Sequence, residues 1–139
     1  MAKRDVYHDI VRRVLEADGW TITDDPLTLK FGSQSVYVDL GAEEAPLAAQ
    51  KASRRIAVEV KSFLAPSAIT EMERALGQYG FYRFLLTRQY PDKLLYLAVP
   101  ENAYISLFDT ADGRDLIASL SVRLLVFDSQ SERIVRWIE

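Results

Sequence analysis

Three ionic side chains stand in apolar, β-prone segments of this sequence, where charges are rare unless they serve a site. Glu59 and Lys61 lie two residues apart in the stretch IAVEVK, and Asp39 is the only charged residue of the stretch SVYVDL. A spacing of two places Glu59 and Lys61 on the same side of an extended strand. If the two stretches pair as strands, Asp39 and Glu59 converge at the strand ends with Lys61 beside them.

Two converging carboxylates form a hard oxygen site that suits Mg²⁺ or Mn²⁺. A metal ion there would polarise a phosphodiester and activate a water molecule. Lys61 would orient or deprotonate that water and stabilise the charge that develops on phosphorus. The alternative is a structural ion pair between Glu59 and Lys61, which is the better interpretation of such a triplet in isolation.

The order and spacing of Asp39 and Glu59-Val60-Lys61 resemble the PD-(D/E)xK signature of nucleases. Val38 stands where that signature usually has proline. The resemblance implies that Asp39 and Glu59 are metal ligands, that the Val60 carbonyl shares the metal, and that Lys61 is the catalytic lysine. It also implies a restriction-endonuclease-like fold.

Gln78 and Tyr82 form a second match, to the Q-x-x-x-Y motif of RecB-type and Holliday-junction-resolvase-like nucleases. Residues four apart are neighbours on one helix face. Their amide and phenol could bond a phosphate or hold Lys61 in place, so we include both among the catalytic candidates. The alternative is an ordinary, partly exposed helix flank.

His8 is the only histidine, and it borders the apolar stripe of the first expected helix, near Arg12. RecB-type nucleases often carry an acid or a histidine near the metal on this helix. The resemblance loosely gives His8 that role, with Asp9 or Glu16 as alternatives. A half-buried structural histidine is the favoured interpretation.

The first half of the chain predicts a helix followed by short strands. Asp5 is expected to cap a helix that runs to about Asp18 and ends at Gly19. Strands are expected at 20–23 and 27–31, separated by the turn Asp24-Asp25-Pro26, and again at 35–40 and 55–61. The alanine-rich stretch 41–53 is expected to be a loop or a short helix.

The second half predicts a long helix from Pro66 to about Arg88, with a core stripe of Ile69, Met72, Leu76 and Tyr79. A buried strand at 94–99 follows, so residues 55–99 form a strand–helix–strand crossover. Helical stretches near 102–108 and 114–119 precede a hairpin of strands 122–127 and 133–138. These elements predict an α/β (α+β) fold with a mixed central sheet flanked by helices.

Length and composition exclude several classes of protein. The 139 residues can bury a core in a single domain, 1–139. Absence of cysteine excludes disulfides and thiolate sites, and a single histidine excludes a multi-histidine zinc site. The charged opening of the chain and the lack of a long apolar run predict a cytoplasmic protein without a membrane segment.

The net charge of −3 does not indicate nucleic-acid binding, but the basic residues cluster. Solvated surface is the usual reason for any single cluster, and contact with the phosphates of DNA is the functional one. We therefore expect DNA as the partner. The candidate phosphate contacts are Arg12, Lys51, Arg54, Arg55 and Arg83.

Over nearly its whole length the chain resembles the XisH group, described as fdxN-element excision-controlling factors of cyanobacteria. The segments 2–8, 56–63, 75–79 and 132–138 carry that resemblance. It implies a part in site-specific DNA rearrangement, beside a recombinase and other excision factors. It does not by itself imply strand cleavage.

Two functions follow as alternatives. One is a metal-dependent endodeoxyribonuclease that uses Asp39, Glu59 and Lys61. The other is a non-catalytic accessory factor that binds DNA or a recombinase, with a protein whose charges are only structural as a third, minor option. An apolar C-terminal edge with Ile134 and Trp137 weakly favours a homodimer.

Overall fold

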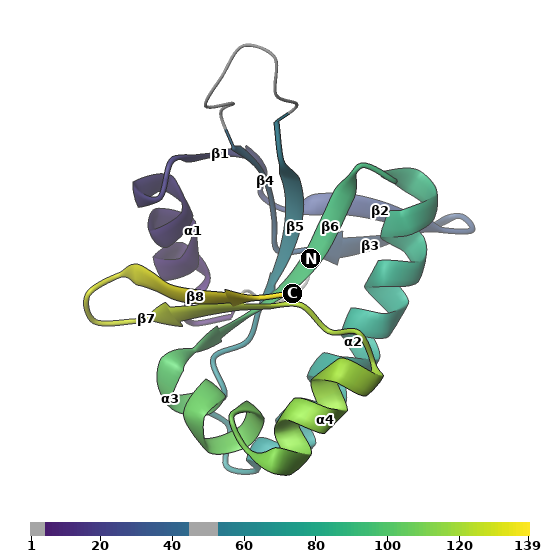
Figure 1. Cartoon of the computed structure of the whole chain (residues 1–139). Coiled ribbons are helices and arrows are strands. Elements are labelled where there is room, and N and C mark those ends of the chain that lie inside the picture. The colour runs from purple at the N-terminus through teal and green to yellow at the C-terminus, as the bar shows by residue number, and fades with distance from the viewer. Residues whose placement is uncertain (1–4, 45–52) are drawn as a thin grey trace.

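The computed structural model describes residues 5–44 and 53–139. Helices and strands make up most of this length (Figure 1). In chain order they are α1 (His8–Ala17), β1 (Trp20–Asp24), β2 (Leu27–Phe31), β3 (Gln34–Val38), β4 (Leu40–Glu44), β5 (Arg55–Val60), α2 (Ala68–Gln89), β6 (Lys93–Pro100), α3 (Glu101–Ala103), the π-helical turn η1 (Tyr104–Phe108), α4 (Ala111–Ser119), β7 (Leu124–Asp128) and β8 (Arg133–Ile138).

Six strands form the main sheet in the order β1-β4-β5-β6-β7-β8, and β2 and β3 pair in a separate hairpin. β5, β6 and β7 run parallel to one another, while the outer pairs are antiparallel. The expected α/β fold with a mixed sheet flanked by helices is confirmed. Within the described residues, no helix has both the length and the apolar character needed to cross a membrane.

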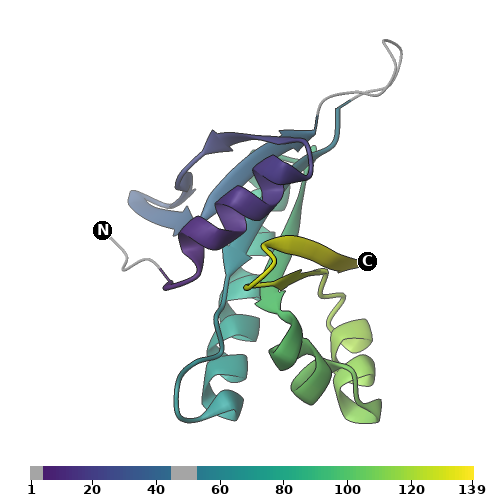
Figure 2. The same cartoon turned by 90° about the vertical axis from the view of Figure 1, so that its left-hand side faces the viewer.

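Two apolar cores lie on opposite faces of the main sheet. Figure 2 views the side that α1 covers, while α2, α4 and the β2–β3 hairpin cover the other (Figures 1 and 2). Strand β5 serves both faces: Ile56, Val58 and Val60 pack in the core under α1, whereas Ala57 packs in the core under α2. This alternation follows from the two-residue period of a strand.

The prediction of a single strand over 35–40 is wrong, because the structure divides this segment at Asp39. Residues up to Val38 pair with β2, and from Leu40 the chain pairs with β5 and β1. Val38 packs under α2 and Leu40 under α1, so these two residues serve different cores although both are fully buried. Asp39 is therefore the junction between the hairpin and the main sheet.

Three further expectations need correction. Residues 41–44 belong to a strand, not to a loop or helix; residues 45–52, Lys51 among them, lie outside the described residues. Asp5 does not cap α1, which begins at His8. The Asp5 carboxylate instead accepts the backbone N–H groups of Tyr7 and Ser62, each at 2.9 Å. Ile69 is 61% exposed, since the buried residues of α2 begin only at Ala75.

The remaining elements follow the sequence closely. Ser67 caps α2 by accepting the Thr70 N–H at 3.2 Å, one residue after the expected start at Pro66. The terminal hairpin forms as expected, and β8 is an edge strand of the sheet. Trp137 on β8 packs against Trp20 and Tyr96, with ring centroids 5.7 and 5.0 Å away.

Candidate functional site

Asp39 and Glu59 meet where the pairing of β4 with β5 stops. The ladder begins at Leu40 opposite Val58, so Glu59 and Val60 extend beyond the end of β4. There the side chain of Asp39 replaces a strand partner: its Oδ2 accepts the Val60 N–H at 2.7 Å. In return the Asp39 N–H donates to Oε1 of Glu59 at 3.2 Å. The two carboxylates are thus fixed against one short piece of backbone.

Glu59 is almost fully buried, with 6% of its surface exposed. Burial raises the pKa of Glu59 well above its ordinary value, and the charge of Asp39 raises it further. The ammonium of Lys61, whose Nζ lies 3.9 Å from Oε2 of Glu59, lowers that pKa and so offsets part of the rise. The pKa of Glu59 thus reflects one unfavourable carboxylate neighbour and one favourable ammonium neighbour.

Lys61 is held by the sheet. Its backbone N–H donates to the Ala98 carbonyl at 3.0 Å, which continues the parallel ladder between β5 and β6. Its side chain is 18% exposed, so most of it is packed against the protein. Asp39, Glu59 and Lys61 therefore lie together, as the spacing predicts, although Asp39 reaches the group from a junction and not from a strand.

His8 is buried, with 2% of its surface exposed, and is not the half-buried residue we expected. Its Nε2 bonds Oδ1 of Asp25 at 2.7 Å, and its Nδ1 lies 3.6 Å from Oδ1 of Asp39. Nδ1 has no hydrogen-bond partner among the described residues. The ring therefore presents an unpartnered polar atom toward the carboxylate site.

Asp25 is the site residue that sequence reasoning missed. Besides His8, it accepts a hydrogen bond at 2.6 Å from Arg12 Nη1, so the arginine and the imidazole share one carboxylate. Asp25 precedes the β2–β3 hairpin and Asp39 follows it, so His8 contacts both ends of that hairpin. The acidic pair before Pro26 indicated only a turn, and no local pattern links Asp25 to His8.

Tyr82 on α2 lies near the carboxylates, and Gln78 is one turn away on the same helix face. The pKa of Tyr82 is raised to about 12, first by burial and then by the charges of Glu59 and Asp39. The phenol therefore lies close enough to feel both carboxylates, and it stays protonated at neutral pH. Oε1 of Gln78 is buried without a hydrogen-bond partner among the described residues, as Nδ1 of His8 is. Buried polar atoms of this kind usually have a ligand or a water as partner.

The residues fit the divalent ion that the nuclease resemblance implies. Asp39 and Glu59 would supply carboxylate oxygens, and Val60, whose carbonyl the resemblance assigns to the metal, is bonded to Asp39 through its N–H. Mg²⁺ commonly uses one or two carboxylates and keeps several waters. In the described part of the chain no group of three or more His, Asp or Glu side chains has the geometry to hold a metal unaided. An ion here would thus depend on water or substrate oxygens for its remaining ligands.

Two of the candidate phosphate-binding arginines lie at the far end of β5 and already have acidic partners. Arg54 is 3.2 Å from Glu139, and Arg55 is 2.7 Å from Asp92. Arg55 and Glu59 are four residues apart in the strand, which separates them by about 13 Å. These contacts do not support a role beside the carboxylates, and the DNA-binding role of both arginines stays a prediction.

The other candidate arginines have partners as well. Arg83 donates to the carbonyls of Leu120 and Ser121 at 2.9 and 2.8 Å, which ties α2 to the end of α4. Arg12 holds Asp25, as described above. Arg83 and Arg12 therefore both make structural contacts in this conformation. That they bind phosphate also stays a prediction.

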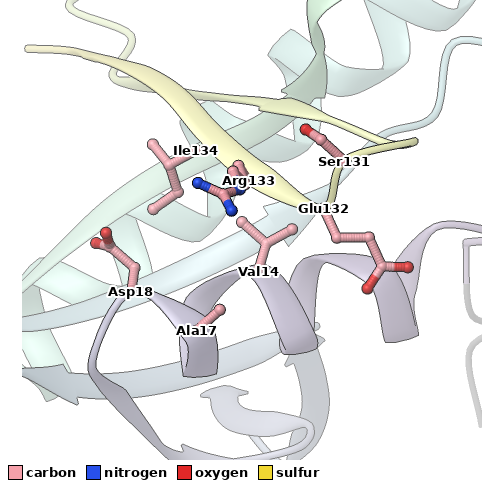
Figure 3. A pocket seen from close by; sticks show the side chains of 7 residues that line it. All are labelled: Val14, Ala17, Asp18, Ser131, Glu132, Arg133 and Ile134. Carbon is pink, nitrogen blue, oxygen red and sulfur yellow. The ribbon is translucent and has the colours of Figure 1, made fainter.

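A separate hollow lies between α1 and the β7–β8 turn (Figure 3). Charged residues line it, and one of them, Glu132, accepts hydrogen bonds from Arg13 at 2.8 and 2.9 Å. None of the carboxylate-site residues lines it, so it is distinct from the candidate site. Its lining residues are Val14, Ala17, Asp18, Ser131, Glu132, Arg133 and Ile134.

Comparison with known proteins gives consistent matches over the whole chain. Residues 1–135 match the family model described as XisH protein. The crystal structure of an XisH family protein from Nostoc punctiforme PCC 73102 is 42% identical, covers 97% of this chain and 100% of its own, and has a TM-score of 0.87.

A second solved structure, an fdxN element excision controlling factor protein from Anabaena variabilis, is also 42% identical. It covers 98% of this chain and 100% of its own, with a TM-score of 0.85. No curated protein matches the chain.

Proposed function

Because this chain belongs to the XisH family, we propose that it acts on DNA during excision of a genetic element, as a metal-dependent phosphodiesterase. The observation that carries the proposal is the arrangement of Asp39, Glu59 and Lys61 around the end of β5. The role in excision rests on the name of the Anabaena variabilis relative, an excision controlling factor.

Each residue of the site has a distinct part in this proposal. Asp39 and Glu59 would hold Mg²⁺ or Mn²⁺, which would supply Lewis-acid polarisation of the phosphodiester. Lys61 orients the attacking water and stabilises negative charge on the phosphate oxygens. Tyr82, protonated because its pKa is about 12, donates a hydrogen bond to a phosphate oxygen. Gln78 offers its amide on the same helix face.

The topology supports placing the chain in the restriction-endonuclease-like superfamily. That superfamily combines a helix, a three-strand meander, a crossover helix and a fourth strand. Here α1, the main-sheet strands β1, β4 and β5, then α2 and β6 follow this order, with the β2–β3 hairpin inserted between β1 and β4. The junction at Asp39 places the first acid of the proposed signature beside the strand that carries Glu59 and Lys61.

The test is cleavage of linear, nicked and branched DNA by the purified protein with Mg²⁺ or Mn²⁺. Glu59→Gln keeps the size of the side chain and the oxygen that accepts the Asp39 N–H, and we expect it to abolish cleavage. Glu73→Gln, an exposed acid on α2, is the matched control and should cleave like the wild type. Equal activity of the Glu59 variant and the control would exclude the proposed site.

A second candidate is a non-catalytic excision factor that keeps the same fold. It is favoured by the lack, among the described residues, of a three-ligand metal group, and by the ion pair between Glu59 and Lys61. Such a factor would bind DNA with an affinity that falls steeply with salt, without cleaving it. Salt-dependent binding, unchanged in Glu59→Gln and accompanied by no cleavage in either protein, would favour this candidate.

We also propose that the protein forms a homodimer through the outer edge of β8. The sequence suggested an apolar edge that includes Trp137, but this residue does not form the proposed contact. That tryptophan is turned to the core, where it packs on Trp20 and Tyr96. β8 is an edge strand and offers unpaired backbone groups. Sedimentation equilibrium of the wild type and of Val135→Pro, a change in this edge strand, tests the proposal: the variant should be monomeric.

A further inference from the structure

A row of aromatic rings runs from the molecular surface to the candidate site. Phe31 at the end of β2 and Phe81 on α2 meet edge to face, with ring centroids 5.3 Å apart. The ring of Phe81 lies 6.2 Å from that of Tyr82, the residue whose pKa is raised by Glu59 and Asp39. Phe31 is 55% and Phe81 38% exposed, so both offer ring surface to solvent.

The rings are held by regular structure and not by a loop. Leu27 and Leu29 are buried under α2, and Phe31 continues the same strand face beyond the buried region. The side-chain amide of Gln89, at the end of α2, clamps the strand by accepting the Lys30 N–H and donating to the Lys30 carbonyl, each at 2.8 Å. The spacing of the two phenyl rings is therefore set by the fold.

The surface around the rings is basic. Residues 74–90 include no Asp or Glu, while Arg74, Phe81 and Arg88 recur at seven-residue spacing. Seven residues are close to two helical turns, so these three side chains share one stripe of α2, with about 10 Å between successive members. Within the described part of the chain, neither Arg74 nor Arg88 lies within 4.0 Å of a carboxylate.

We propose that Phe31 and Phe81 form a stacking platform for an unpaired nucleobase, so that the substrate is single-stranded or branched DNA and not intact duplex. This inference rests on the proposed function, because it names the substrate class of the same site. Exposed aromatic rings beside cationic side chains are how proteins bind single strands, since every base has a π face to stack. In a duplex those faces are covered by neighbouring bases.

The platform lies on the path to the carboxylates. A base on Phe31 or Phe81 is one ring away from Tyr82, so the adjoining backbone passes the phenol and the region of Glu59 and Lys61. Arg74 and Arg88 would contact the phosphates on either side. The same surface of α2 then binds the DNA strand and positions it at the carboxylates.

The test measures binding without cleavage. We would record the fluorescence anisotropy of a labelled oligothymidine strand of about 12 nucleotides, and of a duplex of equal length, in EDTA. Phe31→Ala and Phe81→Ala should each weaken strand binding by about fivefold or more and leave duplex binding unchanged. Phe81→Tyr, which retains a stacking ring, should bind the strand like the wild type.

Tyr37→Ala is the matched control. Tyr37 is an exposed aromatic residue on β3, and its pairing with Thr28 places it on the opposite face of the hairpin from Phe31. Its strand affinity should stay near that of the wild type. No loss in the Phe31 and Phe81 variants, or an equal loss for strand and duplex, overturns the platform. A wild-type dimer that these variants convert to monomers also overturns it, because the rings would then be a self-contact.

The outcomes separate this proposal from the nuclease proposal. Strand binding that depends on Phe31 and Phe81, together with no cleavage by the wild type, supports the platform and overturns the phosphodiesterase. Cleavage that requires Glu59 but proceeds equally on strand and duplex, with no effect of the phenylalanine variants, supports the phosphodiesterase and overturns the platform.

Discussion

His8 Nδ1 lies 3.6 Å from Oδ1 of Asp39, while Nε2 of the same ring bonds Asp25 at 2.7 Å. One imidazole on α1 thereby contacts the residue before the β2–β3 hairpin and the residue after it. Because Asp39 in turn bonds the backbone of Val60, the helix, the hairpin and the end of β5 are joined through a single buried ring. The first prediction tests this connection.

We expect Asp25→Ala to weaken Mn²⁺ binding by about 10- to 100-fold, as loss of groups that orient a metal site commonly does. Asp25 reaches the proposed ligand Asp39 through His8, so it is a positioning residue. The unfolding free energy should also fall by about 1–3 kcal/mol, because a buried histidine and an arginine lose their partner. Mn²⁺ titration followed by electron paramagnetic resonance, and urea unfolding, measure the two effects.

Asp24→Ala is the neighbouring control, since among residues 5–44 and 53–139 the one side-chain hydrogen bond of Asp24 is the one it accepts from the Thr23 hydroxyl. It should leave Mn²⁺ binding unchanged. If Asp25→Ala lowers stability but binds Mn²⁺ as tightly as the control, Asp25 serves the fold alone.

The second prediction concerns the buried charge of Glu59. Its pKa is raised in the folded protein, by burial and by Asp39, so ionisation costs free energy that the unfolded chain does not incur. Protonation of Glu59 therefore contributes to the stability of the folded protein. This contribution is complete below the pKa of Glu59 in the unfolded chain, about 4.3, and is lost as pH rises through the higher pKa of the folded protein. Removal of the charge should stabilise the protein above that range.

Glu59→Gln should thus increase the unfolding free energy by about 0.5–2 kcal/mol at pH 8 and have little effect near pH 4. Urea unfolding at the two pH values in EDTA measures this difference. A destabilised variant at pH 8 would mean that the charge of Glu59 is satisfied within the fold by Lys61, and would count against a cation site.

The third prediction uses the phenol of Tyr82. Because its pKa is about 12, Tyr82 remains a hydrogen-bond donor throughout the working range of pH. Tyr82→Phe should lower kcat for DNA cleavage by about tenfold, the loss expected for one charge-stabilising hydrogen bond of about 1.4 kcal/mol. The ratio of wild-type to variant rates should be the same at pH 7 and pH 10.

Tyr37→Phe, at an exposed position on β3, serves as its control and should not change kcat. A wild-type to variant ratio that falls between pH 7 and pH 10 would contradict the pKa given for Tyr82.

The fourth prediction compares two helical glycines. A Cβ on Gly113 in α4 would lie 2.2 Å from the Leu107 carbonyl and 2.6 Å from Cα of Phe108, both backbone atoms of η1. Gly113→Ala should therefore destabilise the protein by at least about 2 kcal/mol. Gly77 in α2 has no atom within 4 Å of such a Cβ, so Gly77→Ala should stabilise by about 0.5–1 kcal/mol. Thermal unfolding of both variants checks the pair, and similar effects would contradict the packing of η1 on α4.

The sequence was sufficient for most of the regular elements and for the common side of Glu59 and Lys61. Strand β5 shows a clear two-residue period, so the common side of Glu59 and Lys61 could be inferred directly. The parallel crossover through α2 followed from its length and from the apolar strand after it. These features are local, and a local pattern determines them.

The junction at Asp39 could not be inferred in the same way. The residues on either side alternate as a single strand would, because Val38 and Leu40 are both buried, though in different cores. Nothing local marks the change of sheet. The link from His8 to Asp25, and the exposed ring pair of Phe31 and Phe81, likewise depend on segments that only the tertiary fold brings together.

The junction also restricts how the chain can vary in length. With Asp39 alone between two buried residues of opposite cores, an inserted residue would turn Leu40 away from its core or withdraw the carboxylate from Val60. A deletion would remove the link itself. The hairpin tip between Phe31 and Gln34 has no such restriction. Natural or engineered changes in chain length should therefore occur at that tip and spare residues 38–40.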